Sequence, residues 1–380
     1  MNFSNWYPTI NNALALKYNQ NFEFLHFGET GVVNDENIDR INSLGTQSEK
    51  FIKIVFYDME PFSNTYDIKY LGFYNDGWGE GINRTDLDKR PHRIIATSDY
   101  GNKLLDTHIG NVYAITKRKF KIWYYFSHAL IALDWFREYR FYQEDDIINQ
   151  KSFDFAFTTS NRLVTGARNY RLSLVSEILS RNIGNRGITS CTKENLTFDN
   201  KFDISLPKDR IEKIKKFCNV DLRYDFKDAE TIVPNQSMHI NTTVANTCFM
   251  NVVTETCFYD RFNHLTEKVF KPIIMLQPFI ICSTPNSLKF LKRYGFKTFD
   301  KWIDESYDSI SNPEKRINAV VDQIEKLAKL SKQELTDIYT DMLPTLKHNR
   351  FVFFNTLYDT VTSEMWDNLD GILSTSGVEN

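Results

Sequence analysis

Long apolar runs are missing from this sequence of 380 residues. No window approaches the roughly 18 to 20 apolar residues that a membrane span requires. The first residues, MNFSNWYPTINN, lack the positive stretch followed by an apolar stretch that marks a secretory signal peptide. We therefore expect a cytoplasmic protein without a membrane span.

Paired cysteines are also missing. The chain has five cysteines, an odd number, and none of them forms a CxxC pair. This pattern argues against a disulfide framework and against a zinc site, because both need closely spaced or even sets of thiols. We expect buried thiols in a reducing compartment at Cys191, Cys218, Cys248, Cys257 and Cys282.

A dominant charge of either sign is absent as well. The chain has 46 Lys and Arg against 49 Asp and Glu, for a net charge of −3, so no basic tail or strongly anionic surface is expected. Hydrophobic residues make up 42% and charged residues 25%, which is the ordinary globular range. At this length two domains are the better expectation.

Several catalytic motifs are missing too. The sequence contains no GxGxxG, Walker A, GxSxG or HExxH motif, so the dinucleotide, P-loop, hydrolase-elbow and zinc-protease fingerprints do not apply. No convincing DxD motif stands at a strand end, which favours a protein that uses no metal.

The first part of the chain has the pattern of an α/β domain. A β-branched and aromatic run at 51–59 predicts a buried parallel strand, with Asp58 and Glu60 at its carboxyl end. A second strand at 93–98 leads into Asp99, and Ser127 opens a buried helix. Because polarity rises sharply at 143–152, we place the end of this domain at residue 148.

The α/β pattern then starts again. Strands are expected at 153–159, 247–254 and 278–282, and helices at 167–180, at 208–217, from Thr266 onward and from Ser287 to Gly295. We assign 1–148 and 149–312 to two facing Rossmann-like domains and 313–380 to a C-terminal helical brace, with helical stretches that include 331–343 and 348–359.

The segment Thr266-Glu267-Lys268 opens one of the expected helices. Thr266 is a good N-cap. Lys268 in the first turn suits a phosphate group, and Glu267 suits two ribose hydroxyls. The simpler alternative is a capped helix with a solvated lysine, and spacing alone favours that alternative.

The surrounding residues resemble a known donor-binding signature. The stretch VVTETCFYDRFNHLTEKVFKPI, with Glu255 before Thr266 to Lys268, resembles the α1,3-fucosyltransferase family. It is still more similar to phage-encoded glycosyltransferases, which share forms of TEKxFKPI, QPFI and GFKTF before an aspartate-rich segment. Here these are residues 266–273, 277–280 and 295–299, and residues 127–129 and 134–137 also look like pieces of the phage group.

The resemblance covers residues 150–310 and implies a GT-B glycosyltransferase. It implies a nucleotide-sugar donor, with a UDP- or GDP-sugar as the expectation, no other cofactor and no obligatory metal, an inverting transfer and, for a phage protein, the host cytoplasm. Glu255 and Glu267 would contact nucleoside or sugar hydroxyls, and Lys268 the diphosphate. A second phosphate contact would come from Arg162, with Arg168 and Arg171 as competitors. The fucosyl donor does not follow, because residues 253–256 read VTET rather than FENS.

An inverting transfer also needs a general base in the N-terminal domain. Glu60 is the first candidate because it follows a strand and precedes the rigid Pro61. The other candidates are Asp58, Asp99 and His128. For His128, contact with a phosphate or with the acceptor is an equal alternative to the role of base.

Two alternatives to a saccharide-modifying enzyme stay open. The acceptor could be phage DNA with a hydroxymethylated base, which predicts a salt-sensitive affinity for DNA. The chain could instead be a catalytically silent nucleotide-sugar-binding protein, which would bind a donor without transfer and would not respond to Glu60→Ala.

Overall fold

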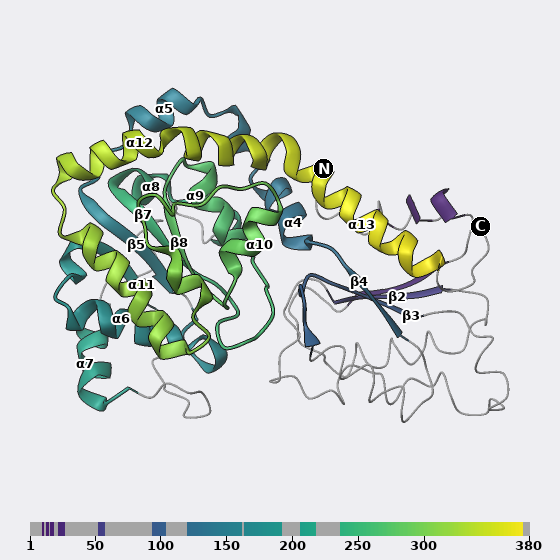
Figure 1. Cartoon of the computed structure of the whole chain (residues 1–380), viewed down its shortest axis with the longest axis horizontal. Coiled ribbons are helices and arrows are strands. Elements are labelled where there is room, and N and C mark those ends of the chain that lie inside the picture. The colour runs from purple at the N-terminus through teal and green to yellow at the C-terminus, as the bar shows by residue number, and fades with distance from the viewer. Residues whose placement is uncertain are drawn as a thin grey trace, which may run out of the picture. The chain divides into compact units, whose positions relative to one another are not determined.

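The protein is described by a computed structural model that covers residues 22–26, 52–57, 93–103, 120–161, 163–191, 206–217 and 236–374, with Ile10, Ala13, Leu14 and residues 16–18. The chain forms two compact units. The first comprises residues 1–134 and 359–380, and the second comprises residues 135–358. Each unit contains one parallel sheet, as Figure 1 shows.

The first unit is built on strands β1 (Phe22–His26), β2 (Ile52–Tyr57), β3 (Arg93–Thr97) and β4 (Phe120–Tyr124). They pair in parallel in the order β1-β2-β3-β4. β4 leads into helix α4 (Ser127–Trp135).

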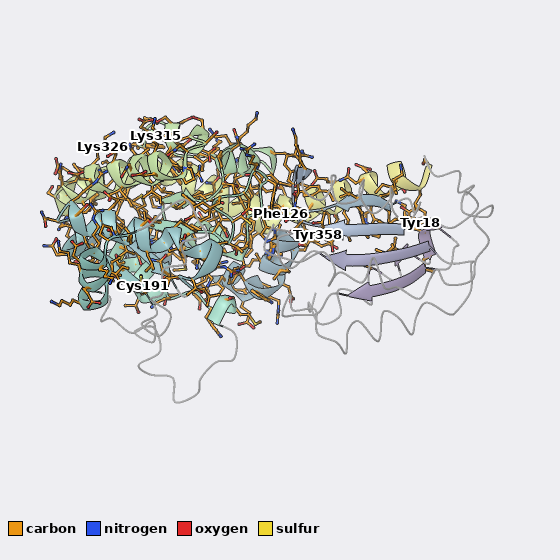
Figure 2. All side chains as sticks on the ribbon, turned by 90° about the horizontal axis from the view of Figure 1, so that it is seen from below. Tyr18, Phe126, Cys191, Lys315, Lys326 and Tyr358 are labelled. Carbon is orange, nitrogen blue, oxygen red and sulfur yellow. The ribbon has the colours of Figure 1, made fainter. Side chains whose placement is uncertain are left out.

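The C-terminal helix α13 (Leu357–Ser374) packs against this first sheet (Figure 1). Trp123 Nε1 donates to the carbonyl oxygen of Met365 at 2.8 Å. Asn368 Nδ2 donates to the carbonyl oxygen of Tyr124 at 2.9 Å. At the far end of the helix, Tyr18, labelled in Figure 2, donates to the Asp370 carboxylate. Residues from both ends of the sequence thus build the first unit.

The second unit is built on strands β5 (Phe155–Asn161), β6 (Gly187–Cys191), β7 (Cys248–Thr254) and β8 (Phe279–Cys282). The strands are parallel and lie in the order β6-β5-β7-β8. The chain therefore starts in the middle at β5, adds β6 on one side and then crosses back to add β7 and β8 on the other. β7 and β8 are almost continuously buried, as is expected of a sheet covered on both faces.

Helices cover this second sheet. The α-helices that the structure describes in this unit are α5 (Glu144–Asn149), α6 (Tyr170–Ser180), α7 (Lys208–Phe217), α8 (Thr242–Thr247), α9 (Phe270–Ile274), α10 (Ser287–Arg293), α11 (Pro313–Ala328) and α12 (Lys332–Phe351). Helix α11 contacts β5 and β8 and packs beside α6, which in turn contacts α7 (Figure 1). Helix α8 packs against β5 and β7, and α12 packs against α9. Short 3₁₀ or π segments include η5 (Arg137–Phe141), η6 (Gly166–Arg168), η7 (Gly184–Arg186), η10 (Gln236–Met238), η11 (Glu267–Val269), η12 (Glu305–Ser309) and η13 (Val352–Thr356).

The α/β class with parallel sheets is as expected, and the arrangement is compatible with a Rossmann-like fold. The units meet in sequence between Asp134 and Trp135, so the boundary expected at residue 148 falls inside the second unit. The expected brace 313–380 is not a separate unit either, because residues 313–358 belong to the second unit and residues 359–380 to the first.

The expectation of buried thiols is confirmed for the four cysteines that the structure describes. Cys191, which is labelled in Figure 2, and Cys248, Cys257 and Cys282 are free and buried. Burial raises the pKa of Cys248 and of Cys282 to about 12, so neither thiol is reactive near neutral pH. Cys218 lies outside the described residues.

Candidate functional site

The second sheet has a topological switch point between β5 and β7. The chain leaves β5 toward β6 on one side and reaches β7 on the other, and open α/β sheets bind ligands beyond the carboxyl ends of such a strand pair. At this point Thr254 Oγ1, at the end of β7, donates to Asn161 Oδ1, at the end of β5, over 3.1 Å. The predicted donor residues follow these two strands.

Glu255 comes directly after β7 and is completely buried. Its Oε1 accepts from the backbone N–H of Thr266 at 3.0 Å, and its Oε2 accepts from the Thr266 hydroxyl at 2.7 Å. The Glu255 carboxylate is therefore held by Thr266, and its contact with nucleoside or sugar hydroxyls stays a prediction.

Thr266 joins the Glu255 carboxylate to the Lys268 ammonium. Lys268 Nζ donates to the Thr266 hydroxyl at 2.8 Å and lies 3.9 Å from Glu255 Oε2 and 3.6 Å from Glu267 Oε1. The side chain of Lys268 is 35% exposed, whereas that of Glu267 is 8% exposed. The three residues predicted from the TEK segment are thus brought together with Glu255, and Lys268 is the member that solvent reaches.

The expected helix that Thr266 opens runs to Ile274, as predicted, but it is not α-helical throughout. Thr266 caps it as predicted, with its hydroxyl accepting from Lys268 N at 3.5 Å. The first turn, however, is the 3₁₀ segment η11, and α9 adds only Phe270–Ile274. A helix this short has a weak macrodipole, so a diphosphate would depend on side-chain cations more than on the helix terminus.

The cluster itself is not electropositive. Two carboxylates, Glu255 and Glu267, and one ammonium, Lys268, sum to a formal charge of 1 − 2 = −1. This cluster alone would therefore not favour an anionic ligand, which would need further cations from the same edge of the sheet.

Arginines from the loop after β5 lie at this edge. Arg168 ends the 3₁₀ segment η6 and is partly exposed. Arg171, in the first turn of α6, is 4% exposed, and its terminal nitrogens donate to three backbone carbonyls. Arg162, the preferred phosphate contact, lies outside the described residues.

A stack of aromatic and guanidinium groups supports the end of β7. Tyr170 donates its hydroxyl to the carbonyl oxygens of Glu255 at 2.6 Å and Cys282 at 3.2 Å. Its ring stacks on Phe258 with centroids 4.0 Å apart, and the guanidinium of Arg316, a residue of α11, lies 4.2 Å from the centroid of the Phe258 ring. Sequence reasoning missed this support because the partners are separated widely along the chain.

The aspartate-rich segment of the resemblance is structural. Asp308 Oδ1 accepts from the backbone N–H of Leu288 at 3.1 Å and so caps α10, whereas the side chain of the N-cap residue Asn286 makes no capping hydrogen bond. Glu305 accepts from Thr298 Oγ1 at 2.7 Å and from the backbone N–H of Phe299 at 2.6 Å. Burial raises the pKa of Asp308 to about 6.

In the first unit, two base candidates lie at the carboxyl edge of the sheet. Asp99 follows β3 and His128 begins α4 after β4, and these strands are neighbours. Both side chains are buried, and Asn102 Nδ2 donates to Asp99 Oδ2 at 2.8 Å. Glu60 and Asp58 lie outside the described residues, so the first choice of base stays a prediction.

No group of three or more His, Cys, Asp or Glu in the described part of the chain is arranged to hold a metal ion. Within the same residues, no helix has the length and apolar character needed to cross a bilayer. Comparison of the chain with protein-family models, with curated proteins and with solved structures finds no match.

Proposed function

We propose that this protein is a glycosyltransferase of GT-B architecture that transfers a sugar from a nucleotide-diphosphate donor to a hydroxyl acceptor. The observation that carries the proposal is the Glu255-Thr266-Lys268 cluster beside the switch point of a parallel sheet. Switch points are where α/β sheets bind nucleotides, and a lysine next to a buried carboxylate is held in one place.

The proposed roles of the second unit follow from exposure and contacts. Lys268 contacts the diphosphate, because its ammonium has three donors and the Thr266 hydroxyl takes one of them. Glu255, which is buried, positions Thr266 through two hydrogen bonds and Lys268 through its charge. Glu267 accepts from sugar or ribose hydroxyls, and Arg168 with Arg162 adds charge against the phosphates. Electrostatic stabilisation of the departing diphosphate is the main catalytic contribution of this unit.

The acceptor base belongs to the first unit in this proposal. Glu60 is the first candidate, and Asp99 and His128 at the carboxyl edge of β3 and β4 are the described alternatives. A buried carboxylate fixed by an amide, as Asp99 is by Asn102, is well oriented to accept a proton from a hydroxyl.

A thermal-shift screen tests the proposal. UDP-, GDP-, ADP-, CMP- and dTDP-linked sugars are added in turn, and a true donor raises the melting temperature through RT ln(1 + [L]/Kd). We expect one nucleotide class to stabilise the wild type and to lose this effect in Lys268→Ala. The control is Lys301→Ala, whose lysine pairs with Asp341 in an exposed ion pair. If no nucleotide stabilises the protein, the proposal is wrong.

Transfer is tested with the nucleotide identified in that screen. Release of the nucleoside diphosphate in the presence of a saccharide acceptor, compared with hydroxymethylated DNA, identifies the acceptor class. Binding without transfer or hydrolysis would show a silent nucleotide-sugar-binding protein instead of an enzyme.

A further inference from the structure

Arg171 is a buried cation without a carboxylate partner. Its side chain comes from α6, and no Asp or Glu of the described residues forms an ion pair with it. Its terminal nitrogens donate instead to the carbonyl oxygens of Leu163 at 2.8 Å, Thr254 at 3.0 Å and Glu255 at 2.9 Å. Its Nε is buried and has no hydrogen-bond partner. A buried charge that forms no ion pair is costly to keep.

The three carbonyls place this charge at the candidate site. Leu163 belongs to the loop after β5, Thr254 ends β7 and Glu255 follows it, so the guanidinium joins the two sides of the switch point. The cluster of Glu255, Glu267 and Lys268 at the same edge of the sheet has a formal charge of −1. An anionic ligand at this edge would be repelled unless a fixed positive charge lies near it.

We infer that Arg171 is a positioning residue that supplies this fixed positive charge for the diphosphate of the donor without touching it. The guanidinium stabilises an anionic group at the edge by its charge, while its hydrogen bonds hold the loop after β5 against the end of β7. Because those bonds exist before any ligand arrives, the charge needs no reorganisation when the ligand binds. This inference rests on the proposed function.

Arg350 offers a matched control in the same unit. It too is a buried arginine, 4% exposed, and it donates to the backbone carbonyls of Ile274, Tyr139 and Tyr142. Helix α9 leads from the carboxyl end of β7 to the amino end of β8, so its last residue, Ile274, lies toward the opposite edge of the sheet. Arg350 is thus likewise bound to three backbone carbonyls away from the candidate site, and it differs in that the charge of Glu144 acts on it.

The experiment compares nucleotides with their nucleosides. Affinities of UDP, GDP and ADP, and of uridine, guanosine and adenosine, are measured by calorimetry for the wild type, Arg171→Lys, Arg171→Gln and Arg350→Gln. We expect Arg171→Gln to bind the preferred diphosphate about tenfold or more weakly while its affinity for the nucleoside is unchanged. Arg171→Lys, which keeps the charge, should retain most of the affinity, and the difference between Lys and Gln should shrink as ionic strength rises.

Opposite outcomes overturn the inference. It is wrong if Arg171→Gln weakens nucleoside and diphosphate equally, if Arg171→Lys binds as poorly as Arg171→Gln, or if Arg350→Gln has the same effect. If Arg171→Gln does not fold, Arg171→Lys decides. A charge role predicts that this variant retains most of its affinity for both the diphosphate and the nucleoside, and an equal loss of both affinities contradicts it. A wild type that binds none of these nucleotides would instead refute the proposed function itself.

Discussion

At the scale of single residues, the Thr266 hydroxyl is the junction of the candidate site. It donates to the Glu255 carboxylate and accepts from both the backbone and the ammonium of Lys268. A hydroxyl has one donor and two acceptor positions, so all of its hydrogen-bonding capacity is used. Thr266 also keeps the buried Glu255 carboxylate from being an unsatisfied charge.

Thr266→Val should therefore lower the free energy of unfolding by more than the loss of one exposed hydrogen bond would. Removal of the hydroxyl leaves one oxygen of a completely buried carboxylate without its strongest donor, at a cost of about 1 to 3 kcal/mol in the free energy of unfolding. Chemical denaturation measures this change. Thr266→Ser keeps the hydroxyl and serves as the control, and an equal loss in both variants would show that packing of the methyl group is what matters.

Asp308 predicts a pH dependence of stability. Burial raises the pKa of its carboxyl from 3.8 to about 6, so protonation favours the folded state. Its stabilising contribution is fully present below about pH 4 and is lost as the pH rises through about 6, a change of about 3 kcal/mol for two pKa units. Asp308→Asn should remove this part of the pH dependence while still accepting from the backbone N–H of Leu288.

The measurement is the free energy of unfolding between about pH 4 and 8 for the wild type and this variant. Asp300→Asn is the control, because Asp300 is 73% exposed and pairs only loosely with Lys292 at 3.7 Å. A wild type and an Asp308→Asn variant with parallel pH profiles would contradict the assignment.

At the scale of elements, β6 depends on a glycine. Gly187 is paired with Phe157 of β5, and a Cβ at Gly187 would come within 2.4 Å of the Phe157 ring. The ring thus fills the space over the glycine and holds β6 beside β5. The short, polar sequence GITSC has little hydrophobic pattern, which is why sequence analysis gave no strand there.

Gly187→Ala should cost about 1 to 3 kcal/mol because it overpacks this contact. Phe157→Leu makes room, so the double variant should lose less than the sum of the two single changes. Thermal or chemical denaturation of the four proteins gives the coupling energy. Additive losses would show that the ring does not contact position 187.

Helix α12 shows tertiary packing overriding a local signal. Two separate helical stretches were expected around Pro344, yet α12 runs without interruption from Lys332 to Phe351. An interior proline costs roughly 3 kcal/mol through a lost hydrogen bond and a steric clash. Met342 and Leu346 on either side are almost completely buried, and burial of such side chains offsets a cost of this size. The start of α12 is set locally by a capping box between Ser331 and Glu334.

At the scale of the whole molecule, the second unit is a continuous segment, residues 135–358, with its own sheet. The described residues of the proposed donor site, from Arg168 to Lys268, all lie within this segment. A unit with its own core is expected to fold alone.

The fragment 135–358 should therefore unfold cooperatively and bind the same nucleotide as the full chain with similar affinity. Circular dichroism melting and calorimetry check the two parts of this prediction. Transfer activity should be absent, because the proposed base belongs to the first unit. A folded fragment that has lost nucleotide binding would show that the donor site needs residues from both units.

The sequence by itself determined the α/β class, most of the second sheet and the positions of the donor candidates. These are local consequences: buried strands are short apolar runs, and Glu255 and Thr266 follow or open elements that the pattern marks. Only the tertiary structure decided which groups meet. It directed Glu255 to Thr266 and Arg171 to backbone carbonyls, took the α10 cap from Asp308, and set the strand order that creates the switch point. Each of these depends on contacts between segments far apart in the chain, whose pairing no local pattern specifies.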